Sequence, residues 1–194
     1  MFRNNKGSSL IVVILVVAFM LAIGIAVLTV TSSGTGVSGN MRNQEMAFNA
    51  AEAGFDASRM ALENLISVGT WTTFSDHYLD EPTGFDIPFI GGAVNPLYFR
   101  RHTDEEVLTM IAPYSTNPDK VIFYNQPFVQ DASGNDDLRY TYTAFLINDE
   151  AGGGTVDPSD VLLVCIGVVR AGTKVLATAR LEIVLESQTV GTNP

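Results

Sequence analysis

Side chains that could carry out chemistry are few in this chain, and none falls in a recognised catalytic pattern. The chain has one cysteine, Cys165, and two histidines, His77 and His102. No serine or cysteine signature of a nucleophilic enzyme accompanies His77. The three consecutive glycines at 152–154 lack the lysine and the following helix of a phosphate-binding loop. We therefore expect no enzymatic activity and no cofactor.

One acidic loop carries oxygen ligands at a spacing that suits calcium. The candidate ligands alternate along the chain: Asp131, Ser133, Asn135 and Asp137. In an EF-hand, a glycine would stand at the position of Asp136 and a bidentate glutamate at that of Tyr142. This incomplete pattern favours a solvated acidic hairpin, with a calcium site as the weaker alternative, and no other metal site is predicted.

Composition narrows the class of protein further. The 194 residues, 46% of them hydrophobic and 16% charged, are too apolar for a disordered chain and too poor in charge for a coiled coil. The net charge of −10 lacks the cationic surface that nucleic-acid binding requires. A single cysteine cannot form an intramolecular disulfide, so Cys165 is interpreted as a buried core residue.

An apolar run occupies residues 10–30 and is interrupted only by Gly24 and Thr29. As a helix it would span about 31 Å, the thickness of the hydrocarbon core of a bilayer. Arg3 and Lys6 precede the run, and basic residues before a first helix hold that end in the cytoplasm. The run is longer than the apolar core of a cleaved secretory signal. We expect an inner-membrane helix that is retained, with the acidic bulk of the chain across the membrane in the periplasm.

A second helical pattern follows over residues 41–67, after a glycine- and serine-rich stretch at 31–40 that we interpret as a flexible joint, able to be helical or extended. A large-residue row consists of Phe48, Ala51, Phe55, Ser58, Leu62 and Leu65. A small-residue row beside it consists of Ala47, Ala50, Gly54, Ala57 and Ala61. Both rows keep helical spacing. The large-residue row is the expected cover for the sheet, and the small-residue row could meet a neighbouring helix.

Residues 68–194 are predicted to form a β-rich head. Residues 68–119 form its variable part. The aromatic-rich stretch at 71–99 either packs this long connection against the head or forms a recognition surface. The capping-box spacing of Thr103 and Glu106 predicts a short helix after Thr103. Residues 120–186 are predicted to form strands: Pro127 indicates that the first is an edge strand or ends there, the second and fourth alternate between apolar and polar residues, and the third is almost wholly apolar, as in a strand buried on both sides. The four expected strands cover residues 120–129, 139–147, 161–169 and 175–186. The expected fold is therefore α+β, a long N-terminal helix whose second half packs on a roughly four-stranded antiparallel sheet.

The N-terminal segments together resemble PilX-type minor pilins of the type IV pilus. The resemblance is carried by the basic leader ending in Gly7, the small residues after it, the apolar helix and the sequence GNMRNQEMAFNAAEAG at 39–54. It implies a leader at residues 1–7 that a prepilin peptidase removes between Gly7 and Ser8, with N-methylation of Ser8. It also implies that residues 8–30 first anchor the chain in the inner membrane and later pack against other pilins at the cell surface.

The chain departs from the pattern of major pilins at two positions. These usually have phenylalanine after the cut and glutamate four residues later, where this chain has Ser8 and Val12. Without that carboxylate, which is thought to neutralise the N-terminal amine of the subunit ahead, we expect a subunit that starts assembly or lies near the tip. A type II secretion pseudopilin and a membrane-anchored adhesin or sensor domain remain alternatives.

Overall fold

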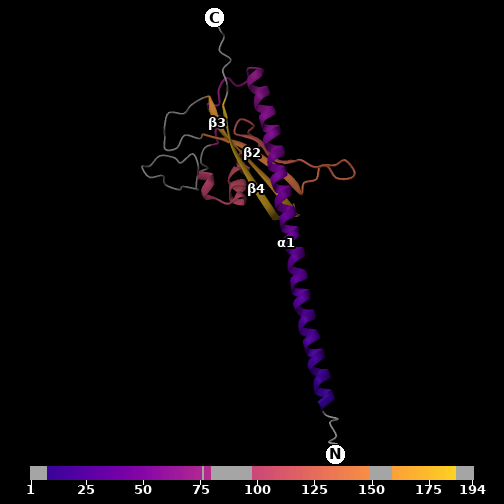
Figure 1. Ribbon diagram of the computed structural model, residues 1–194. Helices are drawn as coiled ribbons and strands as arrows, with labels where there is room; N and C mark the ends of the chain where they lie inside the picture. The colour runs from indigo at the N-terminus through magenta and orange to yellow at the C-terminus, as the bar shows by residue number, and fades with distance from the viewer. Residues whose placement is uncertain (1–7, 76, 80–97, 149–158, 187–194) are drawn as a thin grey trace, which may run out of the picture. The chain divides into compact units, whose positions relative to one another are not determined.

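The computed structural model describes residues 8–75, 77–79, 98–148 and 159–186 (Figure 1). The chain has two compact units, Met1–Arg42 and Asn43–Pro194. The α-helices are α1 (Ser8–Ser67) and α2 (Asp104–Ile111), and the short 3-10 helices are η1 (Tyr98–Arg101) and η2 (Ala112–Tyr114). The strands are β1 (Val121–Pro127), β2 (Tyr140–Ile147), β3 (Asp160–Ala171) and β4 (Lys174–Glu186). The predicted α+β class is confirmed.

The glycine- and serine-rich stretch at 31–40 is helical and forms part of α1. This is one of the two conformations expected for it. Its flexibility stays a prediction.

The four strands form one antiparallel sheet in the order β1-β2-β3-β4, so each strand pairs with its neighbours in sequence. β3 is buried on both sides from Val161 to Val169, as its apolar run predicts. β2 reads as a half-buried strand, yet it is buried on both sides along most of its length. The reason is that helices cover both faces of the sheet, and the alternating threonines of β2 lie beneath this cover.

β3 and β4 form a longer hairpin than the sequence indicates, because the turn is only two residues long. Ala171 pairs with Lys174, which leaves Gly172 and Thr173 as the turn. Gly172 has a φ of 62°, in the left-handed region that two-residue hairpin turns require. One register shift follows the turn, between Val169 and Arg170, and the pairing is then regular from Ala177 to Glu186.

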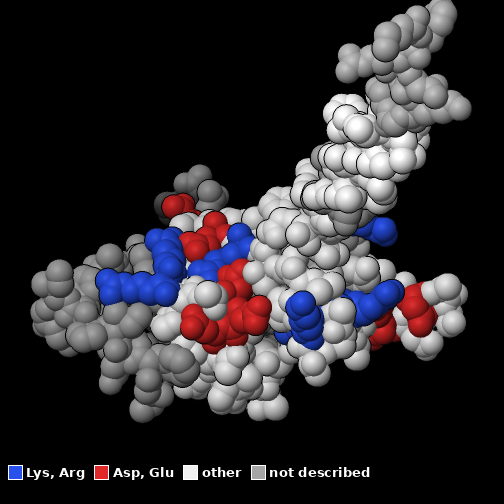
Figure 2. Space-filling model, turned by 90° about the horizontal axis from the view of Figure 1, so that it is seen from below, with Lys and Arg blue, Asp and Glu red and all other residues white. Residues whose placement is uncertain are grey.

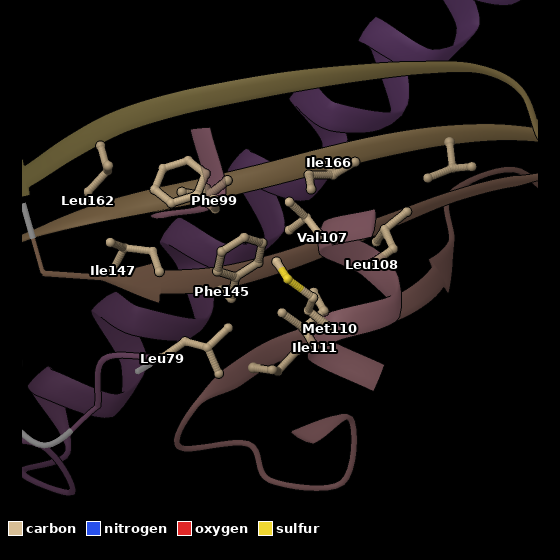
Figure 3. Packing of buried hydrophobic residues seen from close by; sticks show 13 residues of the cluster. Leu79, Phe99, Val107, Leu108, Met110, Ile111, Phe145, Ile147, Leu162 and Ile166 are labelled. Carbon is tan, nitrogen blue, oxygen red and sulfur yellow. The ribbon is translucent and has the colours of Figure 1, made fainter. Parts of the chain in front are cut away.

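α2 and η1 cover one face of the sheet (Figure 3). Thr103 caps α2 as predicted: its hydroxyl accepts from the backbone N–H of Glu106, and the Glu106 carboxylate accepts from the backbone N–H of Thr103. From this cap the helix turns Val107 and Ile111 toward Phe145 of β2. Phe99 of η1 meets the Phe145 ring edge to face, with 6.2 Å between the ring centroids.

Residues 43–67 of α1 cover the opposite face. The acidic residues Glu45, Glu52 and Glu63 of this segment are exposed. The expectation that the large-residue row covers the sheet is right at Ala51, Ser58 and Leu62, which are buried, and wrong at Phe48, which is 44% exposed. In place of Phe48, the small residues Ala47 and Ala50 are fully buried there.

The close approach of α1 to β3 explains this difference. A Cβ added to Gly167 of β3 would lie 2.0 Å from the carbonyl oxygen of Ala47 and 2.5 Å from the amide nitrogen of Ala51. Only small residues fit where two backbones come so close. Further along α1, Leu62 packs with Trp71 and Phe74, so large side chains fill that end of the interface. The space between the helix and the sheet is thus narrow at Gly167 and wider at Leu62.

Candidate functional site

The N-terminal part of α1 is the segment of the chain with the clearest functional chemistry. Residues Leu10–Thr29 form a helix with a mean hydropathy of 3.3, long and apolar enough to cross a membrane. Its large apolar side chains are between 48% and 70% exposed on all sides of the helix. Figure 2 shows the described end of this helix free of acidic and basic side chains. A helix that is apolar all round is stable when lipid or other helices surround it.

The polar groups of this segment are satisfied within the helix. The Thr29 hydroxyl donates to the carbonyl oxygen of Ile25 at 2.9 Å, and the Thr31 hydroxyl donates to that of Val27, also at 2.9 Å. Such bonds to the preceding turn remove the penalty of placing a hydroxyl in hydrocarbon. The threonines at the end of the run therefore do not interrupt its apolar character.

The expected processing site lies at the start of this helix. Ser8 is the first residue of α1, while Gly7, Arg3 and Lys6 lie outside the described residues. Cleavage between Gly7 and Ser8 and methylation of Ser8 stay predictions. Val12 stands at the position where major pilins usually have a carboxylate. Its apolar side chain is 55% exposed on the helix.

The single thiol is part of the core. Cys165 of β3 is 1% exposed and packs beneath α1, which confirms its interpretation as a core residue. Burial raises the pKa of the Cys165 thiol to about 12, and the nearby Ser58 hydroxyl opposes this rise only in part. Because a reactive cysteine must be a thiolate, Cys165 is inert at neutral pH.

The predicted calcium ligands form a self-contained turn between β1 and β2. Asp131 accepts hydrogen bonds from the backbone N–H groups of Ser133 and Asn135, at 2.8 and 2.9 Å. The same two backbone bonds lower the pKa of the Asp131 carboxyl. Asp137 forms an ion pair with Arg139 at 2.6 Å, so its oxygens are also engaged within the protein.

Among the described residues there is no group of three or more histidine, cysteine, aspartate or glutamate side chains that could hold a metal ion. Tyr142, at the position of the missing EF-hand glutamate, is part of β2 and packs on Phe123.

The described aromatic residues of the 71–99 stretch serve packing. Trp71, Phe74, Tyr78 and Phe99 are each at most 8% exposed, so these four do not form a recognition surface. His77 stacks on Trp71 with 3.6 Å between the ring centroids. The other aromatic side chains of the stretch, at 85, 89 and 98, lie outside the described side chains.

One group of charged residues was not foreseen from the sequence. Arg180 of β4 donates from Nε to Asp104 at 2.7 Å, from Nη1 to the carbonyl oxygen of Phe99 at 3.2 Å and from Nη2 to that of His102 at 3.2 Å. Beside it, Arg100 pairs with Glu182 at 2.6 Å. These contacts fasten η1 and the start of α2 to β4. Alternation along β4 could have shown that Arg180 and Glu182 share a face, but not that they would meet residues 76 and 82 positions earlier in the chain.

The comparison with protein-family models matches residues 6–56 to the model described as PilX N-terminal. The match covers the apolar helix and the segment at 39–54 on which the resemblance rests. No curated protein and no solved structure matches the chain.

Proposed function

We propose that this chain, a minor pilin of the PilX type, acts in the initiation of type IV pilus assembly and lies close to the pilus tip. The observation that carries the proposal is the uncharged helix of Leu10–Thr29 within the matched residues 6–56. The helix anchors the chain in the membrane before assembly. In the fibre, the same apolar side chains would pack against the helices of other pilins.

Removal of the leader would change the energetics of leaving the membrane. Cleavage after Gly7 would delete Arg3 and Lys6, so that nine basic residues would remain against 21 acidic ones and the net charge would fall from −10 to −12. Those two cations hold the N-terminus at the cytoplasmic surface, and moving them through hydrocarbon is costly. Processing would therefore release the helix for extraction into a filament. The head, on this proposal, faces the periplasm and later the cell surface, and it has a structural and not an enzymatic role.

The position near the tip is supported by Val12. A valine cannot neutralise the N-terminal amine of a subunit ahead, and this lack is harmless in a subunit that has none ahead of it. Val12→Glu would supply the missing carboxylate. We expect the wild-type chain at pilus ends and the Val12→Glu chain distributed along the shaft, as seen by immunogold labelling. Even labelling of both chains along the shaft would contradict the tip position.

The decisive measurement is the N-terminal sequence of the chain in sheared surface fibres. We expect a sequence that begins with a methylated Ser8, and loss of surface pili when the gene is deleted. A chain that begins at Met1 and is absent from the fibres would indicate a membrane-anchored adhesin or sensor. Normal piliation together with loss of protein secretion would indicate a pseudopilin.

A further inference from the structure

The two edges of the sheet differ in how they are protected. β1 forms one edge, and its pairing with β2 is interrupted by two register shifts, between Val121 and Phe123 and between Phe123 and Gln126. Asn125 has a φ of 49°, and Pro127 ends the strand. Bulges and proline are the usual devices that prevent a foreign strand from pairing with an edge.

β4 forms the other edge and has neither a bulge nor a proline beyond its first residues, and its charged side chains Arg180 and Glu182 are held in ion pairs with Asp104 and Arg100. It is 13 residues long without proline, and its pairing with β3 runs without a shift from Ala177 to Glu186. Figure 3 shows β4 as the outermost strand, with β3 on its inner side.

The direction of the free backbone groups on β4 follows from one contact. Gln44 of α1 donates to the carbonyl oxygen of Thr178 at 2.8 Å, so the backbone groups of Thr178 point away from β3. In an antiparallel strand, backbone direction alternates with each residue. The N–H and C=O groups of Arg180, Glu182 and Val184 therefore also point outward. No backbone bond from these three residues to another described segment is present.

An apolar groove of about 370 Å³ lies beside the same edge. Its lining includes Leu185 and Glu186 of β4, Leu62 and Ile66 of α1, and Phe74. Side chains on a strand added to β4 would alternate between the two faces of the sheet. Those on the α1 face would enter this groove.

The charge at the end of β4 indicates a basic residue in the occupant. Arg59 at the rim is paired with Glu63 at 2.7 Å, whereas Glu186 ends β4 as an exposed carboxylate that makes no ion pair within the described residues. A cation beside Glu186 would complement it.

We propose that the β4 edge, over residues 180–186, binds an extended strand of a different polypeptide. The strand carries apolar side chains at alternate positions, which fill the groove between β4 and α1, and a basic residue opposite Glu186. Backbone bonds to an edge supply affinity in this mode of recognition, and the pockets for alternate side chains supply specificity. This inference does not depend on the proposed function.

A second copy of the chain is the poorer occupant. When residues 180–186 of two copies pair antiparallel, Arg180 of the second copy lies opposite Glu186. Arg180 is already bound to Asp104 and to the carbonyl oxygens of Phe99 and His102, so a second copy offers no free cation at that position.

The test uses the full chain in detergent micelles and a synthetic peptide, Lys-Val-Thr-Val-Thr-Val-Thr, as the probe. In antiparallel pairing its lysine lies opposite Glu186 and its valines face the groove. A peptide of equal composition, Lys-Thr-Val-Thr-Val-Thr-Val, turns the valines away and is the control. The readout is amide hydrogen exchange, residue by residue.

With the probe in excess, we expect exchange at Arg180, Glu182 and Val184 to slow at least tenfold, while Leu181 and Ile183, already bonded to β3, do not change. Val184→Pro removes one outward N–H and should weaken probe binding at least tenfold, whereas Val184→Thr, which retains the N–H, should bind as the wild type does.

Two results would overturn the proposal, and both are read in the wild-type chain whether or not Val184→Pro folds. One is that neither peptide slows the outward amides, or that both do so equally. The other is that these amides are slow before any peptide is added. Protection that rises with protein concentration would then identify a second copy as the occupant, and protection independent of concentration would identify a segment of the same chain.

Discussion

The two faces of the sheet are covered by helices in different ways. On the α1 face, backbone approaches backbone at Gly167, and the buried residues of the helix there are alanines. On the α2 face, large side chains such as Phe99 and Ile111 fill the space, and Arg180 adds an ion pair with Asp104. The contact on the α1 face requires a position without a side chain, whereas the contact on the α2 face requires large side chains. The two faces should therefore respond to opposite kinds of substitution.

The largest effect is expected where an atom is added to the α1 face. In Gly167→Val the new side chain would overlap main-chain atoms of Ala47 and Ala51, which cannot move without displacing the helix. Overpacking of this kind costs about 3 kcal/mol of unfolding free energy, as measured by urea denaturation of the full chain in detergent. Ala171→Val, at an exposed position of the same strand, is the control and should change stability little. A Gly167→Val chain as stable as the wild type would contradict the close approach.

The next effect is expected where atoms are removed from the α2 face. Arg180→Met retains most of the apolar stem but loses the ion pair with Asp104 and the bonds to two carbonyl oxygens. With both charged side chains only about 15% exposed, we expect a loss of about 2 kcal/mol. A double-mutant cycle with Asp104→Asn measures the coupling between the two residues. Additive effects would show that the pair does not stabilise the head.

A smaller effect is expected at the second close contact of α1. In Gly54→Ala the new Cβ would lie 2.9 Å from Cδ2 of Tyr142, a side-chain atom that can shift. The better helix propensity of alanine, about 1 kcal/mol, offsets part of this strain. We expect a net change of about 1 kcal/mol or less, measured in the same denaturation series as Gly167→Val. A loss of unfolding free energy as large as that of Gly167→Val would show that the helix and the sheet are equally close at both glycines.

The smallest effect is a change in how stability depends on pH, and it involves neither face of the sheet. The pKa of Asp131 is lowered in the folded chain by backbone N–H bonds from Asn135 and Ser133. A lowered pKa stabilises the fold above the ordinary value of 3.8, and this stabilisation is lost as the pH falls through the lower folded value. Asp131→Ala should therefore flatten the fall in melting temperature between about pH 4 and lower pH. Melting curves of equal pH dependence in both chains would count against this turn geometry.

How far the sequence predicts the structure depends on the range of the contacts. The capping box at Thr103, the edge strand ending at Pro127 and the buried β3 all follow from neighbours within a few residues. The wrong placement of Phe48 has a different cause. Helical spacing gives two candidate rows, and residues of both are buried, because the distance between α1 and β3 decides which side chains fit at each point along the helix. That distance is set by Gly167, more than 100 residues away in the chain.

The same limit applies to the charged residues of the α2 face. Arg180 and Asp104 are 76 positions apart, and nothing local to either residue indicates the other. The apolar helix, by contrast, could be read completely from its sequence, because its chemistry depends on its own residues and on the medium around it.

The burial of Cys165 has a consequence for where this head can fold. With one cysteine in the chain and that thiol enclosed in the core, the head has no disulfide to form, exchange or lose. Its maturation needs neither an oxidase nor an isomerase, and its melting temperature should be the same with or without a reductant. Export into an oxidising compartment would therefore leave its covalent structure unchanged.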